Sequence, residues 1–258
     1  MDRLQQVGVQ QLGDLKRVFT REWPKYCKEY YCLDTFLELY KKDDQLKDVQ
    51  VYALPNLELG IFVIVDHYQI FVGFLEAEQS ESLFKESLLK FKLYGGEQFA
   101  SMPKRYFNVA NDIIQAKNLK LDLDCVTLSL VLSKEEALLF QVEPPAGFSL
   151  KPVDIDDAQV INDQWEWSEP DSLSVVRRQI LAPDGLLAVL QVKTTYKRRG
   201  FGQLIVKEFA RQEALLGRDT ITEVVPENKA SLGLFTKLGF KINDQCHWLM
   251  TEPPKGVR

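Results

Sequence analysis

The sequence has few of the residues that build metal sites or disulfide frameworks. Its 258 residues include four cysteines and two histidines. No two cysteines have the C-x-x-C spacing, and only His67 and His247 could complete a set of ligands, so no metal site is expected. The cysteines are expected to be free thiols in a reducing compartment. We therefore expect an intracellular protein, either cytoplasmic or mitochondrial.

Long apolar runs and an excess of positive charge are also absent. No stretch reaches the ~18 continuous apolar residues typical of a membrane span, and residues 1–6 lack the long apolar region of a secretory signal. Asp2 and Asp14 interrupt the pattern of a mitochondrial presequence without excluding that compartment. The formal net charge of -5 gives no overall basic surface for nucleic acid. We expect neither a membrane nor a nucleic acid as partner.

Two common phosphate-binding motifs are missing as well. Nothing matches the G-x-x-x-x-G-K-[ST] loop, and the G-x-G-x-x-G dinucleotide fingerprint fails because Ile205 occupies the place of its third glycine. The chain has instead the run Lys197-Arg198-Arg199-Gly200-Phe201-Gly202. This run follows an apolar stretch at 186–192, which predicts a strand, and precedes a helical pattern of apolar residues at 204–216.

A strand, a glycine-rich basic loop and a helix together form the layout of an anion site. The loop amides and the first turn of the helix direct N–H donors and partial positive charge at one place. Gly200 and Gly202 would let the backbone approach a phosphate closely, because they carry no side chain and tolerate positive φ. Lys197, Arg198 and Arg199 add positive charge around that place on an otherwise acidic protein.

A second motif follows after one helix and one predicted strand. The residues from Asn228 to Phe240 have the pattern Asn-x-x-Ser-x-x-Leu-Phe-x-x-Leu-Gly-Phe. In this order the two motifs resemble the acyl-CoA pyrophosphate loop and the closing signature of the GNAT superfamily of N-acyltransferases. Lys197 departs mildly from that family, which usually has Gln or Arg at this place. The C-terminal half is similar to the glycine N-acyltransferase-like branch, and the N-terminal half matches it in length and element order.

The resemblance implies a fold, a co-substrate and a set of binding residues. The fold class is α/β (α+β), with a GNAT-type mixed sheet flanked by helices in the C-terminal half, preceded by a second α/β domain. The co-substrate is acyl-CoA, carrying an acetyl or longer acyl group, with no metal. By family analogy, a backbone N–H near Val192 or Thr194 meets the thioester carbonyl. The residues that the resemblance assigns to acyl-CoA binding are Leu190, Gln191, Val192, Thr194, Lys197, Arg198, Arg199, Gly200, Phe201, Gly202, Asn228 and Ser231.

The resemblance leaves the general base open. In the family the amine attacks the thioester directly, and a base takes the ammonium proton. The run 186–192 contains no acid or histidine, so Glu223 in the next predicted strand is the first candidate, although it could equally point to solvent. His247 is the second candidate, and it could equally be a structural side chain. The family's frequent acid for the leaving thiolate is a Tyr at the place of Phe235, which cannot donate a proton.

A proline- and glycine-containing break at 142–147 divides the chain, because these residues disfavour helix and central strand. We predict an N-terminal α/β domain over 1–143 and a GNAT acyl-CoA-binding domain over 147–250. The elements expected in the first domain are a helix at 9–19, strands at 49–54, 61–65 and 67–74, helices at 80–93 and 103–118 with Pro103 in the first turn, a strand at 121–131 and a short helix at 137–140. Those expected in the second are a strand at 148–152, helices at 158–165 and 172–180, strands at 186–192 and 220–225, and a helix at 229–238.

The second domain is shorter than the family's. Two family strands normally lie between the second helix and the strand at 186–192, but only residues 181–185 intervene here, so the domain is shortened near 180–185. The run 186–192 is apolar on both faces and belongs inside a sheet, with partners on both edges. An uncovered edge favours self-association, so we expect low stability, self-association and weak activity.

The predicted function is transfer of an acyl group from acyl-CoA to the amine of a small acceptor, such as glycine or another amino acid. This is an N-acyltransferase of the EC 2.3.1 type. Two alternatives stay open. One is a catalytically weak CoA-binding or regulatory protein, which Phe235 and the shortened domain favour. The other is a protein or peptide N-acetyltransferase, which would use the same loop.

Overall fold

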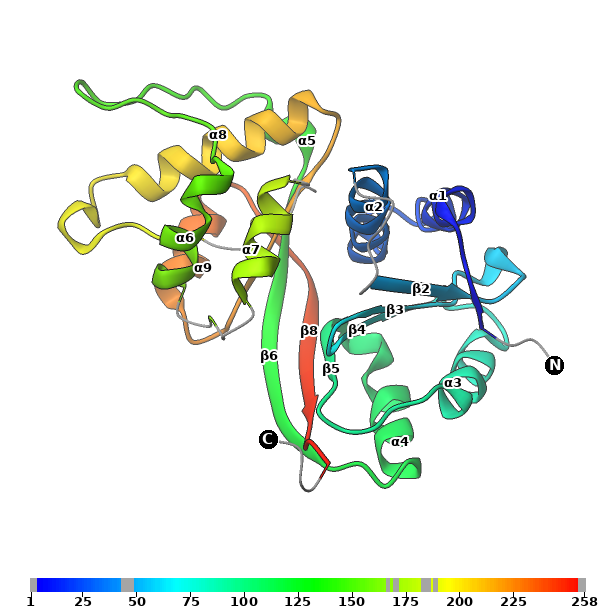
Figure 1. Ribbon diagram of the computed structural model, residues 1–258. Helices are drawn as coiled ribbons and strands as arrows, with labels where there is room; N and C mark the ends of the chain where they lie inside the picture. The colour runs from blue at the N-terminus through cyan, green and yellow to red at the C-terminus, as the bar shows by residue number, and fades with distance from the viewer. Residues whose placement is uncertain are drawn as a thin grey trace. The chain divides into compact units, whose positions relative to one another are not determined.

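The computed structural model describes residues 4–42, 49–165, 168, 172–181, 187 and 190–254 (Figure 1). By compactness the chain divides into unit 1, residues 1–128 and 244–258, and unit 2, residues 129–243. This division falls before the proline-containing break in the sequence. The boundaries 1–143 and 147–250 therefore remain a prediction about independently folding domains.

The described part of the chain forms a mixed sheet of eight strands flanked by helices, which confirms the predicted fold class. The strands hydrogen-bond in the order β1-β2-β3-β4-β5-β8-β6-β7. β2, β3 and β4 pair antiparallel, β4 pairs parallel with β5, and β5 pairs antiparallel with β8. The strands are β1 Gln5–Gln6, β2 Val49–Ala53, β3 Phe62–Asp66, β4 Gln69–Gly73, β5 Gln98–Pro103, β6 Leu121–Leu132, β7 Thr220–Val224 and β8 Lys241–Thr251.

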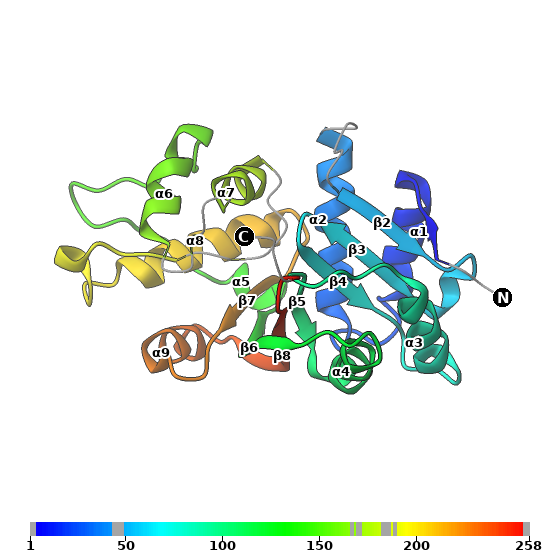
Figure 2. The same cartoon turned by 60° about the horizontal axis from the view of Figure 1, so that its bottom comes forward.

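In unit 1, helices cover both faces of the sheet. These helices are α1 Val9–Val18, α2 Cys27–Lys42, α3 Ser80–Lys90 and α4 Phe107–Ala116. α1 and α2 lie on one face, and α3 and α4 lie on the other (Figures 1 and 2). Because strand side chains alternate between faces, Phe62 packs on Phe19 beside α1, with ring centroids 5.8 Å apart, whereas Val63 is buried in the core formed with α3 and α4.

Unit 2 contains five further α-helices among its described residues, and short 3₁₀ turns occur in both units. The helices are α5 Lys134–Ala137, α6 Ala158–Gln164, α7 Ser172–Leu181, α8 Phe201–Leu215 and α9 Lys229–Lys237. The 3₁₀ turns are η1 Leu57–Leu59, η2 Lys104–Tyr106, η3 Ile155–Asp157 and η4 Thr194–Tyr196. Local capping starts α5, because the Ser133 hydroxyl accepts the Glu136 N–H at 3.3 Å.

The two units share an order of elements. Unit 1 runs β1-α1-α2-β2-β3-β4-α3-β5-α4-β6. The C-terminal part of the chain follows this order from two helices onward, as α6, α7, the residues from Leu187 to the basic loop, α8, β7, α9 and β8. Residues 244–251 of β8 belong to unit 1. Only residues 182–186, which lie outside the described residues, separate α7 from Leu187. Since a strand averages about 5–6 residues, this separation has no room for counterparts of both β2 and β3.

The structure differs from the sequence prediction at several elements. It contains elements that the sequence analysis does not predict, among them α2 and β5. Residues 148–152 form no strand, and the short helix expected at 137–140 is α5, which begins at Lys134. Pro103 is the last residue of β5, so it does not lie in the first turn of α4, which begins at Phe107.

Buried charge and an irregular strand explain why the sequence did not predict α2 and β5. The buried face of α2 carries Glu29 and Asp34, which break the apolar spacing expected of a helix. Both acids have basic partners far away in the sequence: Lys16 lies 2.5 Å from Asp34, and Arg105 lies 2.6 Å from Glu29. In β5 a register shift around Ser101, which has a φ of 51°, interrupts the alternation of side chains.

A polar cluster of Glu29, Arg105 and Tyr106 is buried beside the end of β4. The Tyr106 hydroxyl lies 2.7 Å from both Glu29 Oε1 and the Phe74 carbonyl oxygen, either of which accepts its proton. It also accepts the Phe74 N–H at 3.3 Å. The Arg105 guanidinium pairs with Glu29 and with Asp244 of β8. The cluster therefore satisfies the main-chain groups just beyond the end of β4.

The charge states in this cluster follow from burial and from Glu29. Burial, and then the negative charge of Glu29, raise the pKa of Tyr106 well above its usual value. Burial lowers the pKa of Arg105, but the charge of Glu29 and the other partners of the guanidinium raise it by more, so the guanidinium stays charged. At neutral pH the Arg105 guanidinium is thus charged and the Tyr106 phenol is neutral.

Replacing Tyr106 with Phe should lower the free energy of unfolding by about 1–3 kcal/mol, because it leaves the buried Phe74 N–H and Glu29 without this partner. Urea unfolding followed by fluorescence measures the change. Tyr94→Phe is the matched control, since Tyr94 is 69% exposed and its change should stay within about 0.5 kcal/mol.

The same substitution should change how stability depends on alkaline pH. The folded protein keeps the Tyr106 proton above pH ~10, where the unfolded chain releases it, so this contribution to stability falls as pH rises past ~10. Tyr106→Phe should flatten that part of the profile. Equal losses in the free energy of unfolding for Tyr106→Phe and Tyr94→Phe would show that the Tyr106 hydrogen bonds do not stabilise the protein.

Candidate functional site

The segment before the basic loop is joined to β7. The Leu187 N–H donates to the Ile221 carbonyl oxygen at 2.8 Å, and the Thr222 hydroxyl donates to the Leu187 carbonyl oxygen at 3.0 Å. Of the predicted strand 186–192, residues 187 and 190–192 are described, and none of them is assigned to a strand. Leu187 is nevertheless buried and hydrogen-bonded as a neighbour of β7, which is the arrangement the prediction requires at that residue.

The basic loop leads directly into the N-terminus of α8. It passes through η4 and then through residues 197–200 before α8 begins at Phe201. Gly200, the residue that caps α8, has a φ of 85°, and Arg198 has a φ of 60°. Glycine adopts this left-handed conformation without steric cost. The first N–H groups of α8 have no partner within the helix and carry partial positive charge.

Four cations and no acid lie in residues 193–200. Lys193, Lys197, Arg198 and Arg199 are all exposed. Among the described residues, no carboxylate pairs with any of the four. The Arg199 guanidinium instead lies over aromatic rings of the loop region. The loop therefore carries positive charge that is available to an anion.

A surface pocket of about 310 Å³ lies beside this loop. Its lining contains four residues that the sequence analysis assigns to acyl-CoA binding, Gln191, Val192, Thr194 and Lys197. Two further lining residues, Gln164 and Lys193, were not predicted. Lys193 is detectable in the sequence as a fourth cation of the loop, whereas Gln164 reaches the pocket through the fold, at the end of α6.

The Gln191 side chain forms hydrogen bonds with main-chain groups at this pocket. Its Oε1 accepts the Val192 N–H at 3.3 Å, and its Nε2 donates to the Gln164 carbonyl oxygen at 3.3 Å. Both bonds are long and exposed, and they are made by a flexible side chain. The Val192 N–H is one of the two main-chain groups, with that of Thr194, that the resemblance offers to the thioester carbonyl. It is thus held by a partner that a ligand can replace.

In unit 1, the place that corresponds to this pocket already has internal hydrogen-bond partners. By element order, the end of β4 and the loop before α3 correspond to the segment 187–192 and the loop before α8. Phe74, just after β4, is bonded by the buried Tyr106 hydroxyl. The loop 74–79 carries two glutamates and no cation. Unit 1 therefore offers no comparable anion site at this place.

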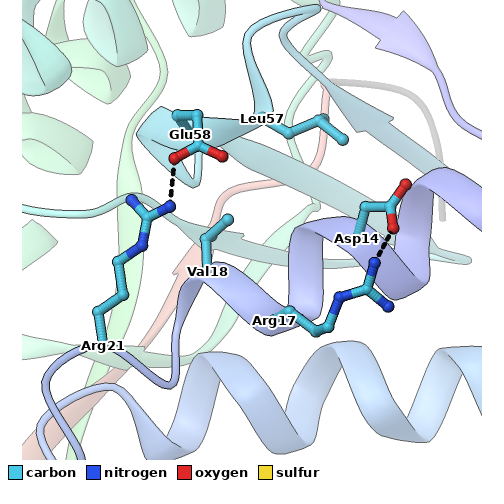
Figure 3. A pocket seen from close by; sticks show the side chains of 6 residues that line it. All are labelled: Asp14, Arg17, Val18, Arg21, Leu57 and Glu58. Carbon is cyan, nitrogen blue, oxygen red and sulfur yellow. Dashed lines mark hydrogen bonds and ion pairs between the residues drawn. The ribbon is translucent and has the colours of Figure 1, made fainter.

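Unit 1 has a larger surface pocket of about 400 Å³, shown in Figure 3. Arg17 pairs with Asp14, and Arg21 pairs with Glu58, on either side of Val18 (Figure 3). Each cation of the lining is thus neutralised by an acid. The pocket beside the basic loop is the better candidate for an anionic ligand.

The second sequence motif forms α9 and its cap. The Asn228 side-chain oxygen accepts the Ser231 N–H at 3.0 Å and thereby caps α9. A Cβ added at Gly202 would lie 3.6 Å from Leu234 of α9 and 3.8 Å from Val192, so the start of α8 lies near both. Phe235 is buried, and its ring packs on Phe240 at 5.1 Å.

The two candidate bases lie in different surroundings. Glu223 is half-buried in β7, between the buried Thr222 and Val224. His247 is buried in unit 1, where its Nδ1 lies 2.8 Å from Asp124 Oδ1 and its ring lies 4.4 Å from that of Phe107. The basic loop belongs to unit 2. Both base assignments remain predictions, and Glu223 is the candidate in the same unit as the loop.

Comparisons with known proteins agree with this architecture. A family model described as FR47-like protein matches residues 170–249, less than half of the chain. A Drosophila protein of known structure is 17% identical, with a TM-score of 0.80 over 98% of this chain and 99% of that chain. A tandem GNAT protein from the clavulanic acid biosynthesis pathway, solved without AcCoA, is 11% identical, with a TM-score of 0.52 over 99% of this chain and 100% of that chain. A GNAT-family acetyltransferase from Colwellia psychrerythraea is 10% identical, with a TM-score of 0.52 over 97% of this chain and 99% of that chain.

These similarities establish the fold. The chain has the fold of GNAT-family acetyltransferases, and it matches a tandem GNAT protein along nearly its whole length. No curated protein matches the sequence. Within the described residues, no three metal-binding side chains cluster together, and no described helix is long and apolar enough to span a membrane.

Replacing Asn228 with Ala should lower the free energy of unfolding by about 1 kcal/mol, because the Ser231 N–H loses its cap. Asn228→Asp is the matched control, since Asp caps helices about as well as Asn. Chemical unfolding compares the two variants. If Asn228→Asp destabilised the protein as much as Asn228→Ala, the cap would not be the reason for the loss.

Proposed function

We propose that this protein is an acyl-CoA-dependent N-acyltransferase that acylates the amine of a small acceptor, such as glycine or another amino acid. The observation that carries the proposal is the four-cation loop, without carboxylate partners among the described residues, that runs into the N-terminus of α8 beside a pocket. Such a loop suits the pyrophosphate of CoA, because cations and oriented N–H groups both stabilise phosphate oxygens. Lys197, Arg198 and the amides around Gly200 are the groups assigned to it.

The pocket residues suit the reacting end of the same molecule. When acyl-CoA binds, its thioester carbonyl would replace the Gln191 side chain at the Val192 N–H. That N–H would then stabilise the negative charge that develops on the carbonyl oxygen. The acceptor nitrogen forms a bond to the carbonyl carbon, and the bond from this carbon to sulfur breaks. Glu223 is assigned to take the proton from the amine, and water protonates the thiolate because Phe235 cannot.

The acceptor and the branch of the family belong to the same proposal. The resemblance of the C-terminal half to glycine N-acyltransferase-like proteins supports a small amino-acid acceptor. A second candidate function is CoA binding with weak or no catalysis. It is favoured by Phe235, which is buried against Phe240 at the place where the family often has a proton-donating tyrosine. A peptide acceptor is the third candidate.

One assay separates the three functions. Free thiol release is measured with acetyl-CoA and benzoyl-CoA against glycine, other amino acids and peptides. Turnover with amino acids supports the proposal, and turnover with peptides alone supports the third candidate. CoA binding without thiol release supports the second. A chain that neither binds CoA nor releases thiol would overturn the assignment of the loop.

Replacing Gly202 with Glu should weaken CoA binding by more than about tenfold. The substitution puts a negative charge near the phosphates, and charge-assisted hydrogen bonds contribute roughly 1.5–3 kcal/mol each. Gly202→Ala is the matched control, because its Cβ meets Leu234 and Val192 at ordinary contact distances of 3.6 and 3.8 Å. Calorimetry measures the affinities, and circular dichroism checks the fold. Unchanged affinity in a folded Gly202→Glu protein would exclude this loop as the phosphate site.

Replacing Glu223 with Gln should lower kcat by about 10²- to 10⁴-fold, as loss of a general base does, and leave CoA affinity nearly unchanged. The loss should be largest at low pH, where the amine is protonated. Steady-state thiol release across roughly pH 6 to 9 provides the measurement. His247→Gln is the comparison. If only the His247 variant lost turnover while remaining folded, the base assignment would pass to His247.

A further inference from the structure

Three aromatic rings gather at the basic loop. We call Phe148, Tyr196 and Phe201 the aromatic cluster. Phe148 and Phe201 have ring centroids 4.8 Å apart, Tyr196 and Phe201 5.6 Å, and Phe148 and Tyr196 6.0 Å. Phe201 is the first residue of α8, and Tyr196 ends η4. Phe148 comes from a distant part of the sequence, so tertiary folding alone brings it to the loop.

The cluster is not an ordinary piece of core. Phe148 is 43% exposed and Tyr196 is 37% exposed. The Arg199 guanidinium carbon lies 5.2 Å from the Tyr196 ring centroid and 5.5 Å from that of Phe201. Partly exposed aromatic rings, a guanidinium over two of them and neighbouring cations thus occupy one place. This combination suits a ligand that has both a flat ring system and phosphate groups.

We propose that the aromatic cluster and Arg199 bind the adenine ring of CoA. This inference rests on the proposed function. In CoA the adenosine is attached directly to the pyrophosphate that the loop is assigned to bind, so the adenine must lie within a few bonds of the loop. Purines stack on aromatic side chains and on guanidinium planes.

The inference makes the nucleotide end of CoA a determinant of affinity. Removing one stacking ring costs about tenfold or more for a base that stacks on it. A ligand without the nucleotide, such as 4′-phosphopantetheine, has nothing to place on the cluster. Loss of the cluster should therefore reduce the preference for CoA over 4′-phosphopantetheine, whereas damage to the whole loop should weaken both ligands.

The test uses the full chain and three ligands, which are CoA, 4′-phosphopantetheine and adenosine 3′,5′-bisphosphate. Phe148→Leu keeps an apolar side chain and removes the ring, and Tyr196→Leu is the second variant in case the first does not fold. Phe140→Leu is the matched control, because the Phe140 ring also lies near a cation, with Lys207 Nζ 5.6 Å from the ring centroid. Lys207 lies within α8 and not in the basic loop. Calorimetry gives the dissociation constants, and circular dichroism checks the fold.

We expect Phe148→Leu and Tyr196→Leu to weaken the binding of CoA and of the bisphosphate about tenfold. The affinity for 4′-phosphopantetheine should change by less than about twofold. Phe140→Leu should change the affinity for none of the three ligands. Equal weakening of CoA and 4′-phosphopantetheine would overturn the inference and give the cluster a purely structural role. Unchanged CoA affinity in the folded variants would overturn it and leave the proposed function standing. Failure of the unmodified protein to bind CoA at all would overturn the proposed function itself.

Discussion

The main-chain N–H groups of Phe74 in unit 1 and of Val192 in unit 2 both need hydrogen-bond partners, and the two units supply them in different ways. In unit 1 the buried Tyr106 hydroxyl bonds the main chain of Phe74, and Glu29 holds that hydroxyl in turn. In unit 2 the Val192 N–H is met by the neighbouring Gln191 side chain, at the surface. The first arrangement is permanent, because breaking it would leave buried polar groups without hydrogen-bond partners. The second can be exchanged for a ligand at little cost.

Charge follows the same division. In unit 1, the loop 74–79 corresponds to the basic loop of unit 2. It contains Glu76 and Glu78, and Glu76 lies 2.9 Å from Lys25. In unit 2 the loop contains cations only, and they face solvent. A shared order of elements thus supports two outcomes. One unit uses the place at the end of its strand for internal packing, and the other keeps it available for an anionic ligand.

Among the described residues, the segment that leads into the basic loop contacts β7 at Leu187. Unit 1 has β2 and β3 between its second helix and β4, but residues 182–186 are too few to form both counterparts in unit 2. The segment that carries Val192 is joined to β7 through Leu187, by one main-chain hydrogen bond and one from the Thr222 hydroxyl. The self-association expected from the sequence, for a sheet with an uncovered edge, stays a prediction.

The sequence by itself determined the features that depend on local physics. The basic loop, Gly200 in its left-handed conformation and the Asn228 cap all follow from neighbouring residues, and the structure contains each of them. Only the tertiary structure decided the rest. Apolar periodicity does not reveal α2, because its buried Glu29 is neutralised by Arg105, 76 residues away. It does not reveal β5, because that strand changes register. Phe148 likewise reaches the basic loop through the fold, since no short-range pattern connects a side chain to a partner so distant in the sequence.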